Sequence, residues 1–239
     1  MLSVVIPTNR PVFLKTQIKR LSGHGFHLIV VSDDFHEEIG ELCKGFPDVK
    51  HVVNDGTRQY AARRTGLKHV TTPKVLLFDD DDIVAPEVLH RVLPKTVGFD
   101  MTLGMPMSYM NSEYFIVVHQ HYMEWSDLLN ISGIIFDTDK IRAIHNTYDL
   151  DEENHNEDFW VALRMYQDGC KVNMLTEFNY VKWNSGLKAW TKLFRESAIK
   201  LWEDILSQED RHHNDPLIEF YFSRRKWRAN LCLPTIKSK

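Results

Sequence analysis

The strongest chemical signal in the sequence is a run of four consecutive aspartates at residues 79–82. The run follows an apolar segment at 75–78 that has the composition of a buried strand. Carboxylates crowded at one strand end raise each other's pKa, and a divalent cation removes that cost. Such hard oxygen ligands suit Mg²⁺ or Mn²⁺ bound jointly with substrate phosphates. The run therefore predicts a metal site that also binds phosphate; an acidic turn that only caps the next helix is the alternative.

A second pair of carboxylates, Asp33 and Asp34, follows the apolar segment at 27–32. Open α/β sheets bind ligands at the carboxyl ends of their strands, where a carboxylate can accept a hydrogen bond from a base N–H or a ribose hydroxyl. Aspartate serves equally well as a helix N-cap. The pair therefore indicates either a nucleoside contact or the start of a helix.

A basic segment follows the turn-forming residues 54–56 and contains Arg58, Arg63 and Arg64. Arginines on a helix after such a turn can face donor phosphates or a nucleobase. Arg63 and Arg64 are adjacent, so a helix points them in different directions. We expect at most one of these two to reach the site.

A further acidic pair, Glu157 and Asp158, opens a predicted helix at 157–166. A carboxylate at a helix N-terminus is favoured by the helix dipole, which by itself explains the pair. The same position can present a general base to a cleft. Both interpretations remain open from the residues alone.

These side chains need a scaffold that gathers strand ends, and the hydrophobic pattern predicts one. Strands are expected at 3–7, 27–32, 49–53 and 74–78, and helices at 11–21, 37–43, 59–69 and from Pro86 onward. Strands that alternate with helices indicate an α/β fold with a doubly wound, mostly parallel sheet.

The pattern becomes mixed after residue 100. Strands are expected at 101–107, 114–119, 131–136, 171–175 and 179–183, and helices at 157–166, ending at Gly169, and at 187–206. The sequence thus predicts one domain over 1–186. It comprises a nucleotide half at 1–99 and an acceptor half at 100–186, and a helical extension at 187–239 follows.

The composition excludes several classes of protein. The 29 basic and 33 acidic residues give a net charge of −4, so the whole molecule is not a polyanion binder. The three cysteines are far apart in the sequence and indicate neither a disulfide framework nor a zinc site. No apolar stretch is long enough for a transmembrane segment. We expect a cytoplasmic protein, either free or peripheral to a membrane.

The C-terminal segment 220–239 departs from this charge balance. It holds six basic residues and no acidic one, with four aromatic residues among them. Such a segment can bind anionic lipid headgroups or nucleic-acid phosphates. A solvated helix face whose aromatic side chains pack on the domain is the alternative.

Taken in order, these motifs resemble the family 2 inverting glycosyltransferases of the GT-A fold. The resemblance covers about residues 2–185. It rests on matching stretches at 4–11, 30–34, 56–67, 77–82, 132–133 and 157–158. Each motif is weak alone, but their order along the chain makes the resemblance specific.

The resemblance implies roles for particular residues. Asp81 and Asp79 would hold Mn²⁺ or Mg²⁺, and Asp158 would deprotonate the acceptor hydroxyl. The residues expected to bind the nucleotide-sugar are Pro7, Thr8, Arg10, Asp33, Arg63, Asp79 and Asp80. Those expected to contact the donor sugar or the acceptor are Gly133, Glu157, Trp183 and Asn184.

Two departures from the family pattern bear on this assignment. The family often has Ala-Arg-Asn where this chain has Ala-Arg-Arg at 62–64. Many members have a late histidine that ligates the metal, whereas the corresponding segment here, 182–185, has none. Asn184 is the substitute that the segment offers, and otherwise the third protein ligand is absent.

The sequence therefore predicts a metal-dependent inverting glycosyltransferase. It would transfer a sugar from a UDP-sugar to a hydroxyl of a glycan or glycolipid, or alternatively of a hydroxylated base in DNA, reached through the basic segment 220–239. Two other classes stay open. A nucleotidyltransferase would need a glycine-rich loop after the first strand, which residues 8–11 are not. A noncatalytic nucleotide-sugar binder would leave Asp158 dispensable.

Overall fold

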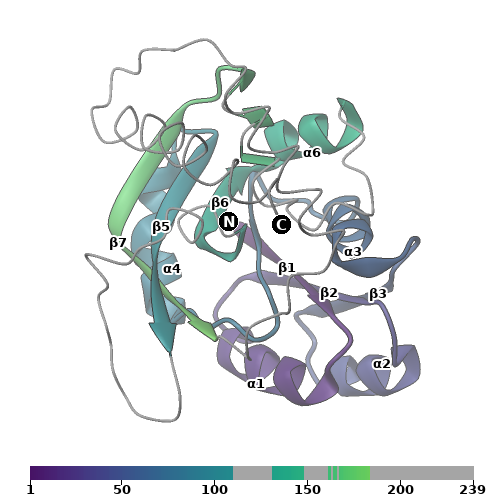
Figure 1. Cartoon of the computed structure of the whole chain (residues 1–239). Helices are drawn as coiled ribbons and strands as arrows, with labels where there is room; N and C mark the ends of the chain where they lie inside the picture. Colours follow the sequence, from purple (N-terminus) through teal and green to yellow (C-terminus); the bar gives the residue numbers. More distant parts are fainter. Residues whose placement is uncertain (110–130, 148–160, 163, 166, 184–239) are drawn as a thin grey trace, which may run out of the picture.

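The computed structural model describes residues 1–109, 131–147, 161–162, 164–165 and 167–183. These residues build a seven-stranded sheet with the strand order β3-β2-β1-β4-β6-β5-β7. Helices cover both faces of the sheet (Figure 1). The predicted α/β fold with a mostly parallel sheet is confirmed.

The first half follows the alternating pattern that the sequence predicts. Its elements are β1 (Leu2–Thr8), α1 (Pro11–Leu21), β2 (His27–Ser32), α2 (His36–Lys44), β3 (Val49–Val53), α3 (Arg58–Leu67) and β4 (Lys74–Leu77). The four strands are parallel to one another. All seven residues of β1 are buried, as expected for a parallel strand covered on both faces.

The second half adds antiparallel pairing. Its elements are α4 (Pro86–Val92), η1 (Leu93–Thr96), β5 (Met101–Tyr109), η2 (Ile131–Gly133), β6 (Ile134–Asp137), α6 (Thr138–Thr147) and β7 (Val172–Trp183). Strand β6 runs antiparallel to both β4 and β5, whereas β5 and β7 are parallel. The sheet is therefore mixed in this half, as predicted.

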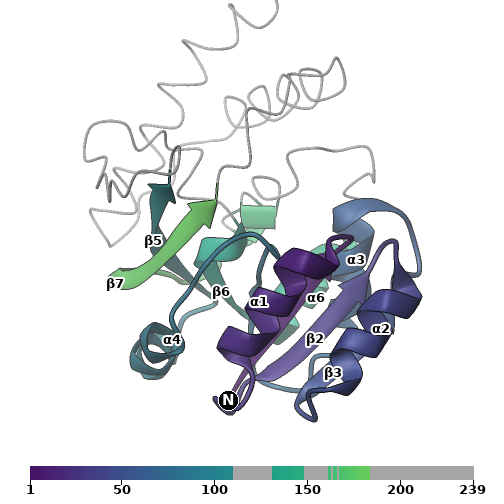
Figure 2. The same cartoon turned by 90° about the horizontal axis from the view of Figure 1, so that it is seen from below.

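Two apolar clusters hold the layers together, one on each face of the sheet. Alternate β1 residues point to opposite faces: Val5 packs with α3 and α6, and Val4 and Ile6 pack with α1, α2 and α4. Figure 2 shows α1 and α2 side by side on one face. The carboxyl ends of β1, β2 and β4 are thereby fixed next to one another.

Helix α3 is anchored closely to the sheet and to α6. A Cβ at Gly66 would lie 2.3 Å from Val5 Cγ1, so only glycine permits this approach of α3 to β1. Arg142 of α6 donates from Nε and Nη2 to the Leu67 carbonyl, at 3.0 and 2.9 Å. The Leu67 carbonyl, at the C-terminal end of α3, accepts from this guanidinium and also from the Val70 N–H at 3.3 Å.

Several sequence expectations differ from the structure. The segment predicted as one strand at 131–136 begins with the short helix η2, and the strand starts at Ile134. The two late strands form one strand, β7, whose pairing with β5 is irregular between Leu103 and Met105. Helix α6 was not predicted. The strand at 114–119, the start of the helix at 157–166 and the extension 187–239 lie outside the described residues.

The end of the predicted 157–166 helix is confirmed at Gly169. This residue has a φ of 73°, and the Cys170 N–H donates to the Met165 carbonyl at 3.0 Å, which closes the last helical turn. In the described part of the chain, no helix has the length and apolar character that a membrane crossing requires.

Candidate active site

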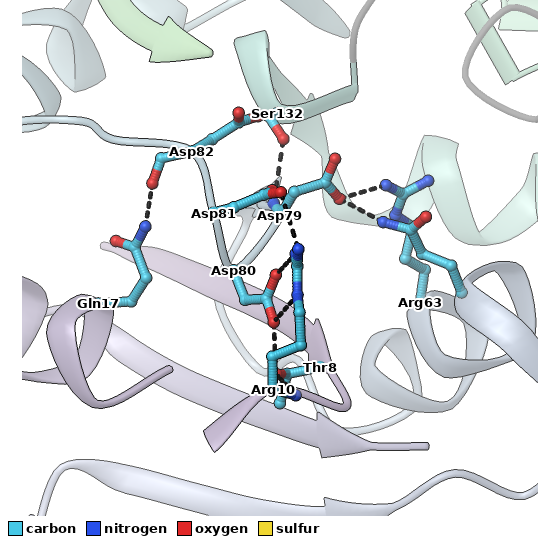
Figure 3. Close-up of polar contacts among 10 residues, drawn as sticks. Thr8, Arg10, Gln17, Arg63, Asp79, Asp80, Asp81, Asp82 and Ser132 are labelled. Atoms are coloured by element: carbon cyan, nitrogen blue, oxygen red, sulfur yellow. Dashed lines mark hydrogen bonds and ion pairs between the residues drawn. The ribbon is translucent and has the colours of Figure 1, made fainter. Parts of the chain in front are cut away.

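The aspartate run forms a turn one residue after β4, and two separate segments hold its backbone. The Asp82 N–H donates to the Asp79 carbonyl at 3.2 Å, which closes the turn. The Asp79 N–H donates to Ser132 Oγ at 3.0 Å, and the Gln17 side-chain amide donates to the Asp82 carbonyl (Figure 3). The backbone of the turn is therefore fixed from α1 on one side and η2 on the other.

The four aspartates occupy different environments. Asp80 and Asp82 are buried, at 3% and 1% exposure. Asp79 and Asp81 keep side-chain exposures of 22% and 16%. Asp79, Asp80 and Asp81 line a cleft of about 400 Å³ at the carboxyl ends of β1, β2 and β4. The turn thus presents Asp79 and Asp81 more openly than Asp80.

Thr8 and Arg10, at the end of β1, donate hydrogen bonds to the Asp80 carboxylate. Arg10 donates to both Asp80 carboxylate oxygens, from Nε at 3.2 Å and from Nη2, and Thr8 Oγ1 donates to Oδ2 at 2.6 Å. Burial raises the pKa of the Asp80 carboxyl, and these hydrogen bonds oppose that shift. Partial burial lowers the pKa of Arg10, but the bonds to Asp80 and Asp81 raise it above its ordinary value.

Asp79 is held by two side chains of α3. Arg63 Nη2 and Gln59 Nε2 both donate to Asp79 Oδ1, each at 2.5 Å. Arg63 is 2% exposed, so its charge faces Asp79 from within the protein. A buried guanidinium paired with a carboxylate forms a strong, oriented charge pair at the edge of the cleft.

The opposite end of the cleft, beside β2, is held by a neutral amide. Asn54 Nδ2 donates to Asp33 Oδ1 at 2.7 Å and to the Arg58 carbonyl at 3.3 Å. The Asp33 N–H donates to the Thr8 carbonyl at 3.0 Å. Arg58 has a φ of 68°, a left-handed conformation that is uncommon outside glycine and recurs at functional sites. Asp33 is thereby fixed at the rim of the cleft.

Comparison with known sequences settles the family. The profile described as glycosyl transferase family 2 matches residues 3–150, more than half of the chain. The chain belongs to glycosyl transferase family 2. A pneumococcal relative, glycosyltransferase GlyA of Streptococcus pneumoniae serotype 4, is 26% identical over 126 residues; the match spans 48% of this chain and 18% of GlyA.

Solved structures confirm the GT-A fold of this family 2 chain. S. aureus TarS 1-349 in complex with UDP-GlcNAc aligns with a TM-score of 0.65 and 16% identity, over 95% of this chain and 72% of TarS 1-349. The mannosyltransferase PcManGT from Pyrobaculum calidifontis, in complex with GDP-Man and Mn²⁺, aligns with a TM-score of 0.66 and 12% identity. This alignment covers 99% of this chain and 73% of PcManGT. At these identities the likeness shows the fold.

The structure places most of the predicted donor residues of this glycosyltransferase together. Six of them line the cleft: Pro7, Thr8, Arg10, Asp33, Asp79 and Asp80. Arg63 lies behind Asp79 and is not among the lining residues. Their roles stay predictions, although their common position at one sheet edge is what nucleotide-sugar binding requires.

Of the predicted acceptor-side residues, the structure describes Gly133 and the backbone of Trp183. Gly133 is buried against Tyr180, and a Cβ at this position would lie 2.3 Å from Tyr180 Cε1, so packing accounts for the glycine. Trp183 ends β7 next to Tyr109. Asp158, Glu157 and Asn184 lie outside the described residues.

Two residues that orient the site carry no signal in the sequence pattern. Gln59 holds Asp79, and Gln17 holds the backbone of the aspartate turn. Gln59 follows Arg58 at the start of α3, and Gln17 lies 65 residues before Asp82. Only the packing of α1 and α3 at the sheet edge brings these amides to the turn.

The carboxylates at the cleft fit a divalent cation. Asp79 Oδ1 accepts from α3 and Asp81 Oδ2 accepts from Arg10, so the second oxygen of each carboxylate has no bond to the described residues. No group of three His, Cys, Asp or Glu side chains among those residues forms a metal cage. Mg²⁺ and similar ions commonly use one or two carboxylates and take other ligands from phosphates and water.

Proposed function

We propose that this chain is a metal-dependent inverting glycosyltransferase that uses a UDP-sugar and a hydroxyl acceptor. The observation that carries the proposal is the presentation of Asp79 and Asp81 at one cleft, with the buried Arg63 behind Asp79. Both carboxylates stand at the carboxyl end of β4, beside the ends of β1 and β2, where open α/β sheets bind ligands.

The charged end of the cleft suits the donor diphosphate. Asp79 and Asp81 would hold Mn²⁺ or Mg²⁺, which supplies the positive charge that stabilises a leaving diphosphate. Arg63 holds the Asp79 carboxylate in position in the absence of the ion. PcManGT, which shares the fold, was solved with a nucleotide-sugar and Mn²⁺ together.

The β2 end of the cleft suits a base. Asn54 engages Asp33 Oδ1, which leaves Asp33 Oδ2 to accept the N3–H of uracil. Pro7 lines the same region of the cleft and offers an apolar surface to the ring. TarS, with the same fold, was solved with UDP-GlcNAc. We therefore favour UDP over other nucleoside diphosphates.

Asp158 is the general base of the proposed reaction. Its carboxylate would take the proton from the acceptor hydroxyl while the acceptor oxygen attacks the anomeric carbon. The bond from that carbon to the diphosphate oxygen breaks as the new bond forms on the opposite face, which inverts the configuration. A glycan or glycolipid is the proposed acceptor, reached by a cytoplasmic enzyme free or peripheral to a membrane.

Donor hydrolysis tests the function without knowledge of the acceptor. The full chain is incubated with a panel of UDP-, GDP-, ADP- and CDP-sugars in Mn²⁺, and released nucleotide is measured. We expect release from one or more UDP-sugars, lost in EDTA and restored by Mn²⁺ or Mg²⁺. Release from GDP-sugars alone would contradict the uracil assignment, and equal release in EDTA would contradict the metal assignment.

The segment 220–239 offers a test of the acceptor. Changing Arg224, Arg225 and Arg228 to Ala should weaken acceptor use and spare donor hydrolysis, if this segment binds an anionic partner. Binding to anionic liposomes that weakens with salt supports a glycolipid acceptor, and such binding to duplex DNA alone supports the modified base. Binding to neither at low salt excludes a polyanionic partner for the segment.

A further inference from the structure

Arg10 lies between the first strand and the aspartate turn, and local contacts fix its position. It follows β1 and precedes α1. Its backbone N–H donates to Thr8 Oγ1 at 3.0 Å, and its guanidinium lies 4.7 Å from the centre of the Phe13 ring. Arg10 also lines the cleft, so a positive charge belonging to the protein already stands beside Asp80 and Asp81.

The guanidinium contacts its two aspartates unequally. It gives Asp80 two nitrogens, Nε and Nη2, and it gives Asp81 one, Nη1 at 3.0 Å from Oδ2 (Figure 3). Asp80 is 3% exposed and also accepts from Thr8, whereas Asp81 is 16% exposed. The bond to Asp81 can therefore break while Arg10 stays paired with Asp80.

We propose that Arg10 is a positioning residue that occupies Asp81 in the metal-free protein and thereby makes metal binding depend on nucleotide. The inference rests on the proposed function, because it takes Asp81 as a metal ligand. A guanidinium and a divalent cation at one carboxylate repel each other, so the ion must displace Nη1 or bind against its charge.

The donor diphosphate relieves this competition. Its oxygens add ligands to the ion, and they also offer an acceptor to the Nη1 hydrogens that the ion displaces from Asp81. Metal and nucleotide then bind more tightly together than separately. By linkage, the nucleotide raises the metal affinity by the same factor as the metal raises the nucleotide affinity.

The experiment measures Mn²⁺ binding to the full chain in the absence of nucleotide, by electron paramagnetic resonance of the free ion. Arg10→Gln removes the competing charge, and we expect it to tighten Mn²⁺ binding by about tenfold, the scale of one hydrogen bond between charged groups. Arg91→Gln is the matched control, because Arg91 is exposed on α4 and donates to the Glu177 carbonyl. This control should leave Mn²⁺ affinity unchanged.

A second arm identifies the carboxylate that takes the ion. Arg10→Gln combined with Asp80→Asn should keep the gain, because the ion binds Asp81. Loss of the gain would mean that the ion had moved to Asp80, which overturns the proposal. Arg10→Lys keeps a charge but lacks the planar fork that bridges both carboxylates, so it should also tighten Mn²⁺ binding, by a smaller factor.

Unchanged or weaker Mn²⁺ binding in a folded Arg10→Gln protein overturns the inference. If that variant does not fold, the same result in Arg10→Lys overturns it. A wild-type protein that fails to bind Mn²⁺ even with saturating UDP refutes the proposed function instead. The two failures are therefore distinct.

Discussion

The two ends of the cleft are built from different chemistry. At the β4 end, Asp79, Asp80 and Asp81 are paired with the guanidinium groups of Arg10 and Arg63. At the β2 end, Asp33 is held by the neutral amide of Asn54 at 2.7 Å. A diphosphate with its metal needs fixed charges, whereas a base needs a few oriented donors and acceptors. In the proposed function, this contrast assigns the diphosphate to the β4 end and the base to the β2 end.

Removal of the proposed base should leave both ends intact and have the largest effect on turnover. Asp158→Asn keeps the side-chain shape but cannot accept the proton. We expect turnover to fall by about 10²–10⁴-fold with UDP binding close to normal. Steady-state rates and calorimetry measure the two quantities. Turnover within a few-fold of wild type would assign the base to another carboxylate.

Removal of Arg63 should damage the charged end selectively. Arg63→Gln leaves Asp79 without its buried partner, and we expect a loss of about 2–3 kcal/mol in the free energy of unfolding, since Asp79 is only partly buried. UDP affinity in Mn²⁺ should fall as well. Arg64→Gln, one residue away, is the matched control and should cost far less. Equal losses of unfolding free energy in the two variants, measured by urea denaturation, would show that the contact with Asp79 does not stabilise the fold.

Low pH should destabilise the packing of α3, which carries Arg63, through His145. This imidazole is 7% exposed, and its Nδ1 lies 3.0 Å from the hydroxyl of Tyr60, which shares α3 with Arg63. Burial, with the nearby charges of Arg63 and Arg64, lowers the pKa of His145 from 6.5 to about 3. The unfolded chain therefore takes up a proton below pH 6.5 that the folded chain does not bind.

The free energy of unfolding should consequently decrease as the pH is lowered from 6.5 to about 3. The contribution of His145 is about 1.4 kcal/mol per pH unit, or about 2 kcal/mol at pH 5 relative to neutral pH. His145→Phe keeps a ring against Tyr60 and should have a correspondingly shallower slope in urea denaturation at pH 7, 6 and 5. His24→Phe, at an exposed site, controls for loss of a histidine. Parallel slopes in wild type and His145→Phe would contradict the assignment.

Loss of Asp33 should affect the β2 end of the cleft alone and produce the smallest change. UDP should raise the melting temperature more than GDP does, and Asp33→Ala should remove that preference, at a cost of about 1–1.5 kcal/mol in UDP binding. Asp34→Ala is the control, because Asp34 is exposed and does not line the cleft. An unchanged preference in Asp33→Ala would place the base elsewhere.

The sequence predicted the first half of the fold well because its signals are local. Strands β1, β2 and β4 are short runs of mainly buried residues, and helices α1 and α2 carry an amphipathic periodicity. The second half depends on pairing between distant segments. The irregular register of β7 against β5 lies at Gly104, where an added Cβ would be 2.6 Å from the Phe178 carbonyl. No local pattern encodes that approach.

The site shows the same division between local and distant information. The aspartate run was recognisable from composition and from its place after a strand. The sequence did not reveal that Asp80 is buried and Asp81 more open. Thr8 and Arg10, about 70 residues earlier in the chain, create this difference. Helix α6 was missed although Ile141, Ile144 and His145 carry a helical spacing.

Metal-dependent nucleotide binding tests the central claim most directly. UDP binding is measured by calorimetry in Mn²⁺ and in EDTA for wild type, Asp81→Asn and the control Asp139→Asn, whose parent side chain is 94% exposed on α6. We expect Mn²⁺ to tighten UDP binding by at least about tenfold in wild type and the control. Asp81→Asn should bind UDP equally in Mn²⁺ and EDTA. A full Mn²⁺ effect in folded Asp81→Asn would contradict a metal site at the aspartate turn.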